Sequence, residues 1–242
     1  NYKDNPEQYT DRIYQMGLSK ALDLELPYPN NLKIPIANKT SWSGVTLPWM
    51  SIGYEMQLTP IHILAFYNAI ANKGRMIKPI FVSTINKGNK VIEKFSTEVI
   101  NPAICSRSTI DKIHELLVAV VNQGTAQNIK TDKYLIAGKT GTTVLNYSNR
   151  KQDEAKKYRA SFVGYFPASK PKYSCIVVVS NPKNSRIYGG QIAAPIFKEL
   201  SDKVFAMEIS LQNPMSLVEK NKNLPKVQNG STLMASLVLE YL

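Results

Sequence analysis

One ten-residue stretch, residues 134–143, constrains the fold of this chain more than any other. It reads Tyr-Leu-Ile-Ala-Gly-Lys-Thr-Gly-Thr-Thr, an apolar run that changes abruptly into a cation, hydroxyls and glycine. The apolar half predicts a buried strand, and the polar half predicts that this strand borders a cleft. Because side chains alternate along a strand, Lys139 and Gly141 would lie on one face. Thr140 and Thr142 would lie on the other, so all four can serve one site only on a twisted edge strand.

The Lys-Thr-Gly triplet in this stretch carries the groups that a site for an anionic substrate needs. Lys139 supplies a positive charge, and Thr140 and Thr142 supply hydroxyls that can donate to a carboxylate. Gly141 leaves room for a substrate backbone to lie along the strand. A triplet this short also occurs at ordinary strand ends that are followed by a turn, so its meaning depends on the rest of the chain.

The composition and charge are typical of a folded globular protein. Of its 242 residues, 43% are hydrophobic and 20% are charged. The longest apolar runs are far shorter than the ~18 residues that suggest a membrane span. The net charge of +12 is scattered along the sequence without a nucleic-acid-binding motif. It therefore favours a solvated basic surface, or attraction to an anionic surface such as cell wall or lipid headgroups, over nucleic-acid binding. Cys105 and Cys175 lack the spacing of zinc ligands; their spacing allows a disulfide but does not indicate one, and we expect two free thiols.

Periodicity and turn residues predict a mixed fold. The expected helices cover residues 5–17, 61–73, 108–124 and 191–207, and the expected strands cover residues 76–85, 90–95, 134–143, 159–166 and 173–179. The first two strands flank Asn-Lys-Gly-Asn, which is typical of a hairpin, and the last three form an antiparallel meander. Residues 18–49 are rich in Pro, Asn and Gly and predict an irregular connection. We therefore expect an α+β fold, an antiparallel sheet covered by helices.

The helix sequences also predict which residues are buried or capped. The helix at 61–73 is apolar nearly all round, so we expect it to be fully buried. Ser108 and Asp111 predict a capping box at the start of the next helix. The last helix follows a Gly-Gly pair, and its large apolar residues recur four positions apart, which predicts a buried stripe. These residues are Ile192, Ile196, Leu200 and Val204.

The C-terminal residues read as a linker followed by a separate unit. Residues 214–223 are polar and rich in lysine, which is typical of a linker. Residues 224–242 then begin a second unit with a Leu-Pro-Lys-Val segment and an apolar-striped run. This unit is too short to close a core by itself.

Six ordered signatures include and surround the Lys-Thr-Gly triplet. They are Gly-Tyr-Glu at 53–55 with Leu-Thr-Pro at 58–60, Ala-Asn-x-Gly at 71–74, Val-x-x-Gly-Thr-Ala at 121–126, Gly-Lys-Thr-Gly-Thr at 138–142, Ala-Ser-Phe-x-Gly-Tyr-x-Pro at 160–167 and Gly-Gly-x-x-Ala-Ala-Pro at 189–195. In this order they resemble the transpeptidase domain of class B penicillin-binding proteins, and most closely the cell-division type. The resemblance implies that residues 1–213 form the C-terminal part of that domain, a penicillin-binding protein and serine β-lactamase-like fold truncated at its N-terminal side. Residues 224–242 resemble the start of a PASTA module.

The resemblance implies D,D-transpeptidation of peptidoglycan stem peptides. In that reaction a serine attacks the D-Ala-D-Ala amide, and the amine of a neighbouring strand then takes the acyl group. Lys139 would be the catalytic residue present here, and it would hold the hydrogen-bonded cluster around the serine motif. Lys139, Thr140, Gly141 and Thr142 would bind the substrate, with the N–H of Thr142 as an oxyanion donor. β-Lactams would acylate the same serine, and the resemblance implies no cofactor and no metal.

The two other motifs of the family, Ser-x-x-Lys and Ser-x-Asn, are not found in the expected context. Residues 169–172 and 180–183 match Ser-x-x-Lys literally, but both segments follow the triplet and contain proline. The family places its nucleophile at the start of a buried helix before the triplet, and the sequence contains no Ser-x-Asn. We therefore expect that this chain lacks the nucleophile and is inactive by itself.

The same resemblance implies partners and a location. We expect peptidoglycan stem peptides, β-lactam antibiotics and membrane proteins of cell division and wall synthesis as partners, no nucleic acid, and self-association of the isolated chain. The expected location is periplasmic or otherwise extracytoplasmic, with an anchor in the plasma membrane outside this chain. The alternatives are a serine β-lactamase or D,D-carboxypeptidase of the same fold, or a non-catalytic module that binds cell wall or senses β-lactams. His62 and His114 are expected to have structural or surface roles.

Overall fold

A computed structural model describes residues 2–25, 32–37, 42–145, 155–183 and 186–208. The elements in chain order are α1 (Pro6–Gln15), α2 (Thr46–Ser51), α3 (Pro60–Ala71), β1 (Met76–Ile77), β2 (Thr84–Lys87), β3 (Lys90–Lys94), β4 (Val99–Asn101), α4 (Arg107–Asn122), the 3-10 helix η1 (Gln127–Ile129), β5 (Ala137–Val144), β6 (Tyr158–Phe166), β7 (Tyr173–Ser180) and α5 (Gly189–Met207). No helix in these ranges is long and apolar enough to span a bilayer.

The chain divides into one compact unit, Asn1–Asp202, and a second, Lys203–Leu242. Only residues 203–208 of the second unit are described, and they form the end of α5 and the residue after it. The predicted linker and the PASTA-like segment, residues 214–242, lie outside the described residues. The sheets, the helix packing and the candidate site all belong to the first unit.

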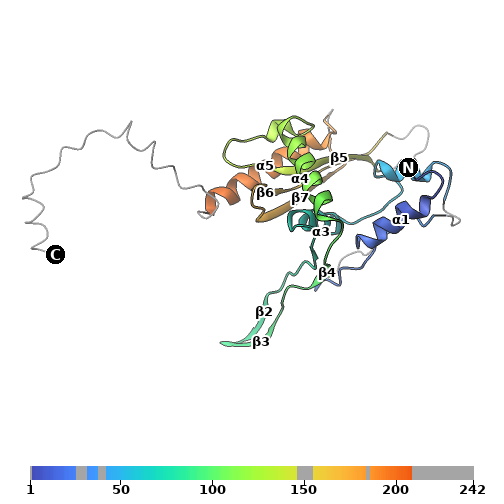
Figure 1. The fold of residues 1–242 in the computed structure, drawn as a ribbon. Coiled ribbons are helices and arrows are strands. Elements are labelled where there is room, and N and C mark those ends of the chain that lie inside the picture. The colour runs from blue at the N-terminus through green and yellow to red at the C-terminus, as the bar shows by residue number, and fades with distance from the viewer. Residues whose placement is uncertain (1, 26–31, 38–41, 146–154, 184–185, 209–242) are drawn as a thin grey trace, which may run out of the picture. The chain divides into compact units, whose positions relative to one another are not determined.

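A three-stranded antiparallel sheet with the order β5-β6-β7 forms the centre of the first unit (Figure 1). Lys139 of β5 lies opposite Val163 of β6, and Thr142 lies opposite Ala160. The strand β7 pairs with the other side of β6. The three predicted strands of the meander are therefore confirmed. Within the described chain β5 is an edge strand of this sheet, as the alternation of its residues predicts.

The strand β5 begins three residues later than predicted. Residues 134–136 precede it, and Tyr134 and Ile136 are buried. The ladder does not extend to them because β6 ends at Phe166, and the proline that follows has no N–H to donate. Instead, Ala168 N donates to Leu135 O at 2.7 Å. Tyr134 and Ile136, in the apolar half of residues 134–143, are thus buried as predicted, but they precede the β5–β6 ladder and do not belong to it.

Helices cover both faces of the sheet. On one face Phe197 of α5 packs against Phe162 and Phe166 of β6, with ring centroids 4.8 and 5.8 Å apart. On the other face Ala137 and Tyr165 of the sheet join one core cluster with residues of α3 and α4. The members of that cluster from the two helices are Ala65, Ala69, Ile70, Ile110 and Leu117. This arrangement confirms the α+β class.

The helix α3 is only partly buried, so the prediction of full burial is wrong. Its buried residues are His62, Ala65, Ala69 and Ile70. Pro60 is exposed, and the other apolar side chains of α3, including Phe66 and Tyr67, are half-buried. An apolar sequence shows that a helix belongs to a core, but it does not show how many sides its neighbours cover.

The helix α4 has a different N-cap from the one predicted. Ser106 caps it, since its Oγ accepts from Thr109 N at 3.3 Å, and Ser108 lies inside the helix. Asp111 forms an ion pair with Arg107, with Nε and Oδ1 3.0 Å apart. The chain enters α4 in an extended conformation at Ser106, which makes this serine the cap. The predicted capping box was therefore placed two residues too late.

The predicted hairpin is confirmed, but it is shorter than expected. The strands β2 and β3 pair around Gly88, which has a positive φ of 58°. Residues 76–77 form β1, which pairs with β4 instead. Pro79 separates β1 from β2 because it cannot donate to a ladder. The hairpin extends away from the central sheet (Figure 1) and carries Lys87 and Lys90 beside its turn.

The helix α5 begins at Gly189, two residues earlier than predicted, and buries a different face. Its buried residues are Gly189, Gly190, Ala193, Ala194, Phe197 and Ser201. Ile196 and Leu200 of the predicted stripe are 42% and 46% exposed. The predicted stripe is therefore wrong, because small residues let the helix approach the sheet closely while the large aliphatic residues face outward.

The histidines and cysteines have the roles expected of packing residues. His62 is fully buried; its Nε2 lies 3.2 Å from Lys20 O, and its Nδ1 lies 2.7 Å from Thr59 Oγ1. A carbonyl can only accept, so the imidazole is the Nε2–H tautomer and Nδ1 accepts from the threonine. His114 stacks on Tyr165 in the core. Both cysteines are free thiols, as expected.

Candidate active site

The backbone of β5 presents hydrogen-bonding groups at the edge of the sheet. Leu145 N donates to Lys157 O on the β6 side at 2.7 Å, whereas Val144 N donates to Tyr54 Oη at 3.4 Å. Successive residues of a strand direct their N–H and C=O groups to opposite edges. Thr142, two residues before Val144, therefore directs its N–H away from β6. The edge that borders the candidate site carries this donor.

Lys139 and the two threonines occupy opposite faces of β5, as predicted, and meet at its edge. Lys139 is exposed, and its Nζ donates to Thr140 O at 2.9 Å. Because Thr140 directs its carbonyl to the same edge as the N–H of Thr142, the ammonium group bends around the strand to that edge. The cation and the outward backbone groups thus lie together on one side of the strand.

The hydroxyl of Thr142 is held by the first residue of α5. Gly189 N donates to Thr142 Oγ1 at 3.1 Å, while the Thr142 side chain remains exposed. Since the oxygen accepts this bond, the hydroxyl proton points elsewhere and can be donated to a ligand. The N-terminus of a 19-residue helix also places a partial positive charge at this point. Thr142 is therefore prepared to donate to an anion.

The hydroxyl of Thr140 is paired with a residue that the triplet does not contain. Thr125, between α4 and η1, has its Oγ1 2.8 Å from Thr140 Oγ1. Either hydroxyl can be the donor in this bond. When Thr125 donates to Thr140, the hydroxyl proton of Thr140 is available to a ligand. Asn128 of η1 donates from Nδ2 to Gly190 O at 2.9 Å and links the same turn to the start of α5.

Two glycines allow this close assembly. A Cβ at Gly189 would lie 2.5 Å from Gly141 O and still closer to Ser161 O. A Cβ at Gly190 would overlap Thr125 O. Because these neighbours are backbone oxygens, they cannot rotate away. The Gly-Gly pair is therefore required for the contact between α5, β5 and the Thr125 turn, and it lies inside the helix rather than before it.

The structure brings together all four residues predicted for the site and adds others. Sequence reasoning missed the roles of Thr125, Gly189 and Asn128. Thr125 and Gly189 belong to two of the six signatures, Val-x-x-Gly-Thr-Ala and Gly-Gly-x-x-Ala-Ala-Pro, so the order of the signatures was the available signal. No sequence signal indicated Asn128.

The other candidate groups lie elsewhere. Ser169 lies in the turn between β6 and β7, and Ser180 ends β7, so neither is placed on a helix as a Ser-x-x-Lys nucleophile requires. In the described ranges, no group of three or more His, Cys, Asp or Glu side chains could hold a metal ion.

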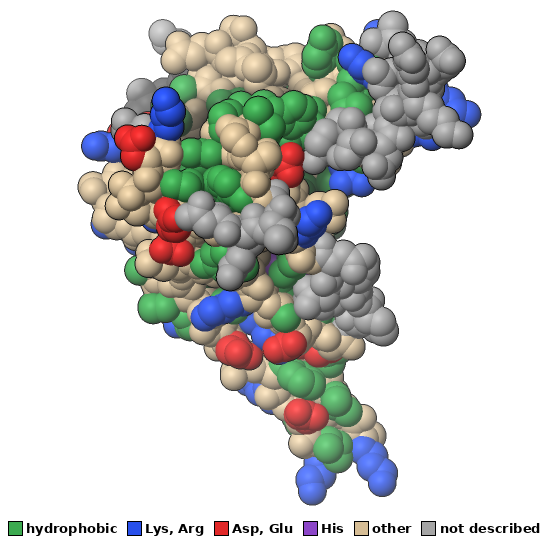
Figure 2. All heavy atoms as spheres, turned by 90° about the vertical axis from the view of Figure 1, so that its right-hand side faces the viewer, with side chains coloured by type: hydrophobic (Ala, Val, Ile, Leu, Met, Phe, Trp, Pro, Cys, Tyr) green, Lys and Arg blue, Asp and Glu red, His purple; other side chains and the backbone are tan. Residues whose placement is uncertain are grey.

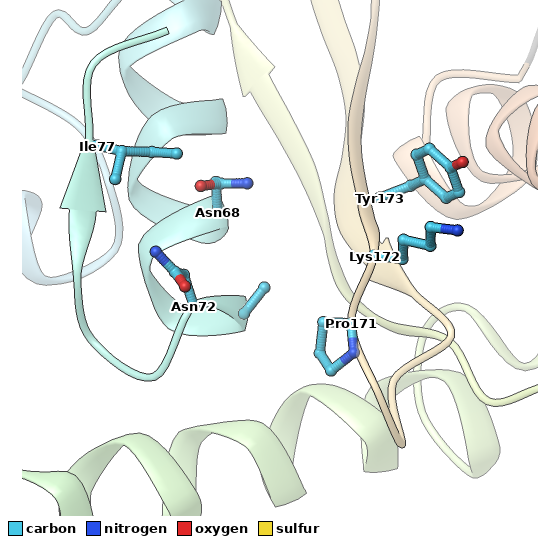
Figure 3. Close-up of a pocket in the computed structure, with 7 residues that line it drawn as sticks. Asn68, Asn72, Ile77, Pro171, Lys172 and Tyr173 are labelled. Carbon is cyan, nitrogen blue, oxygen red and sulfur yellow. The ribbon is translucent and has the colours of Figure 1, made fainter. Parts of the chain in front are cut away.

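A polar pocket of about 200 Å³ lies at the other end of the sheet (Figure 3). It is lined by residues of α3, of β1 and of the turn before β7, including Asn68, Asn72 and Pro171. Tyr173, also in its lining, pairs with Phe166, whereas Thr142 pairs with Ala160 at the opposite end of β6. This pocket is therefore separate from the groups around Thr142.

Comparison with known proteins identifies the family of this chain. Residues 3–202 match the family described as the penicillin binding protein transpeptidase domain. The chain belongs to this family. It is 33% identical over 172 residues to the peptidoglycan D,D-transpeptidase FtsI of Buchnera aphidicola, and the match covers 71% of this chain and 28% of that protein. It is also 33% identical over 173 residues to penicillin-binding protein H of Bacillus subtilis, with 68% of this chain and 24% of that protein covered.

Solved structures of penicillin-binding proteins share the fold. Penicillin-binding protein 3 of Mycobacterium tuberculosis, solved in complex with aztreonam, superposes with a TM-score of 0.72 at 26% identity. The match covers 87% of this chain and 48% of that one. The chain thus spans only part of the length of these penicillin-binding proteins, and β5 with its Lys-Thr-Gly triplet lies within the part that matches the family.

Proposed function

We propose that the full-length protein is a peptidoglycan D,D-transpeptidase and that this chain supplies the side of its active site that binds the substrate carboxylate. The observation that carries the proposal is the pair of prepared donors on Thr142. Its hydroxyl oxygen is held by Gly189 N, and its N–H points to the sheet edge. A D-Ala-D-Ala terminus offers a carboxylate and a carbonyl oxygen, which are the two acceptors that such a pair can serve.

The hydroxyls bind and orient the substrate. Thr142 donates to the terminal carboxylate, and Thr140 donates a second bond when Thr125 donates to it. The partial charge at the start of α5 and the ammonium group of Lys139 favour the anion over a neutral end. Gly141, between the two threonines, leaves space for the peptide to lie along β5.

The reaction is acyl transfer through an ester. A serine oxygen attacks the carbonyl carbon of the penultimate D-Ala, and its proton passes to a neighbouring base. The N–H of Thr142 donates to the oxygen that becomes negative in the tetrahedral intermediate, a bond worth about 3 kcal/mol in comparable sites. The base then gives this proton to the amide nitrogen, the C–N bond breaks, and D-Ala leaves as an amine. The amine of a second stem peptide attacks the ester and forms the new amide, and its proton passes through the base to the serine oxygen, which leaves as a hydroxyl. A β-lactam acylates the same serine, because its amide carbonyl and carboxylate occupy the same positions.

The substrate also supports a location and further partners. Because stem peptides are cross-linked outside the plasma membrane, we infer an extracytoplasmic protein anchored in that membrane. The net charge of +12 favours contact with anionic cell wall. Cell-division and wall-synthesis membrane proteins are the partners that such a location offers.

The full-length protein with Thr142→Val tests the role of this residue. Valine keeps the shape of threonine but removes a hydrogen bond to a charged group, which is worth about 1.5–3 kcal/mol. Acylation by a fluorescent penicillin should therefore slow by roughly one to two decades. Thr142→Ser retains the hydroxyl and is the matched control. If the valine variant folds normally and acylates at the wild-type rate, Thr142 does not belong to the site.

A further inference from the structure

A second cavity lies between the start of α1 and the segment that leads into α2. It has a volume of about 660 Å³, within the range of small-molecule sites. The lining residues that matter for its chemistry are Tyr2, Lys3, Tyr9, Trp42, Pro48 and Ser51. We call this cavity the aromatic groove. The N-terminal elements lie on the right-hand side of Figure 1, and that side faces the viewer in Figure 2, where hydrophobic side chains gather.

The groove combines aromatic rings with polar groups. Tyr2 and Tyr9 meet edge to face with ring centroids 5.5 Å apart, and Trp42 lines the same groove. Tyr9 and Trp42 also pack on a small core cluster of Ile13, Leu18 and Met50, which holds their rings in place. Lys3 and Ser51 line the groove and are exposed. Ser51 Oγ donates to Pro48 O at 2.6 Å, which leaves its oxygen free to accept.

This combination fits a sugar ring better than a purely apolar partner. A pyranose ring has one face of C–H groups that packs on an aromatic ring, and a rim of hydroxyl and acetamido groups that needs hydrogen-bond partners. Aromatic rings held rigidly lose little entropy on binding. A hydrophobic helix would leave the lysine and serine groups without partners. A proline-rich peptide is the nearest competitor, because aromatic grooves also bind polyproline helices.

The groove is connected to β5 through two aromatic residues. Trp49 follows Pro48 in α2, which begins inside the segment expected to be irregular, and packs edge to face on Tyr54 with ring centroids 5.1 Å apart. Tyr54 Oη accepts from Val144 N of β5. A ligand that occupies both the groove and the edge of β5 would follow this path.

A stem peptide is long enough to extend from Thr142 past the end of β5 that contacts Tyr54. A peptide of five residues spans at most about 17–18 Å. From Thr142 the path runs two residues along β5, about 7 Å, and then crosses Tyr54 and Trp49. The far end of a stem peptide whose carboxylate lies at Thr142 is attached to an amino sugar. A peptide that runs from Thr142 toward Val144 would therefore carry its sugar past Tyr54, which contacts Trp49 beside the groove.

We propose that the aromatic groove binds the glycan strand of peptidoglycan, a polymer of N-acetylated amino sugars. This proposal rests on the proposed function, since it names the second part of the same substrate. The glycan would hold the strand while its stem peptide lies along β5. The groove would then add affinity without taking part in acyl transfer.

The 242-residue chain and a tetramer of N-acetylglucosamine test the proposal without any acylation step. Chemical shifts of backbone amides, followed during titration with the tetramer, should show saturable binding. Trp42→Ala should weaken that binding at least fivefold, and Tyr2→Ala, at a residue outside the core cluster, should weaken it in the same direction. Phe81→Ala is the matched control, because Phe81 is an aromatic residue 54% exposed and outside the groove. Circular dichroism establishes that each variant is folded.

Several results would overturn the proposal. No saturable binding of the tetramer, or equal affinities of the wild-type chain and a folded Tyr2→Ala variant, would exclude a glycan site here. Equal losses in Phe81→Ala would show that the effect is not local. Saturable binding of a proline-rich decapeptide, lost in Trp42→Ala, with no binding of the tetramer would assign the groove to a peptide. Because penicillin acylation plays no part in this assay, its outcome and that of the Thr142 test are independent.

Discussion

The substitution Gly189→Ala tests whether the start of α5 must lie directly against β5. A methyl group there would lie 2.5 Å from Gly141 O and closer still to Ser161 O, and neither backbone oxygen can rotate away. Overpacking of this kind lowers the free energy of unfolding by up to about 3 kcal/mol. Alanine has a higher helix propensity than glycine, which offsets about 1 kcal/mol of this loss. The net loss should be about 2 kcal/mol. For a chain of this size that lowers the melting temperature by roughly 4–8 °C.

Thermal unfolding of the 242-residue chain, followed by circular dichroism, measures this loss. Gly44→Ala is the control, because a Cβ at Gly44 has no atom within 4 Å and its φ is not positive. Its stability should change by less than about 1 kcal/mol. If the two variants melt at the same temperature, the close contact of α5 with β5 is not required for stability, and the argument that Gly189 N positions the Thr142 hydroxyl loses its basis.

Three further predictions concern stability and assembly. Burial lowers the pKa of His62, although its hydrogen bond to Lys20 O opposes the shift. The free energy of unfolding should therefore be highest above pH 6.5 and should fall as the pH drops toward the lowered pKa. Urea titrations that show a flat profile from pH 7.5 to 5.5 would contradict the burial of a neutral imidazole. Tyr134→Phe removes the hydroxyl that bonds to Ser201 and Asp202, each at 2.8 Å. In urea titration it should lower the free energy of unfolding by about 1–2 kcal/mol. An unchanged midpoint would show that these two hydrogen bonds make no net contribution to stability. The isolated chain should sediment as a dimer or larger species, because α3 and β7 leave apolar side chains half-exposed; a monomer at all concentrations would refute this.

Local sequence patterns predicted the central sheet well. Residues 159–166 and 173–179 alternate or run apolar between clear turn residues, and both strands are found within one residue of the expected bounds. The position of β5 at the sheet edge followed from the need for Lys139 and Thr142 to share a site. The first residue of β5 could not be predicted in this way, because the β5–β6 ladder ends at the proline that follows β6, and this proline is distant in sequence from β5.

The helices show what a pattern cannot determine. The apolar stripe of α5 predicted the wrong face, since the helix packs on the sheet through Phe197 and buries Ala193 and Ala194, whereas Ile196 is exposed. In the same way, Thr125 was recognisable only as part of a signature. Its contact with Thr140 joins residues from a turn and a strand, and no local periodicity records such a contact.

The central claim is that the Thr142 hydroxyl binds the carboxylate of the substrate. It is tested most directly by the release of D-Ala from a stem peptide ending in D-Ala-D-Ala and from the same peptide with a C-terminal amide. Both substrates are compared in the full-length protein and in its Thr142→Val variant. The wild-type protein should prefer the carboxylate, and the valine variant should lose roughly 10- to 100-fold of that preference in kcat/KM, which corresponds to a hydrogen bond to a charged group. If the two proteins show the same preference, the hydroxyl does not contact the carboxylate.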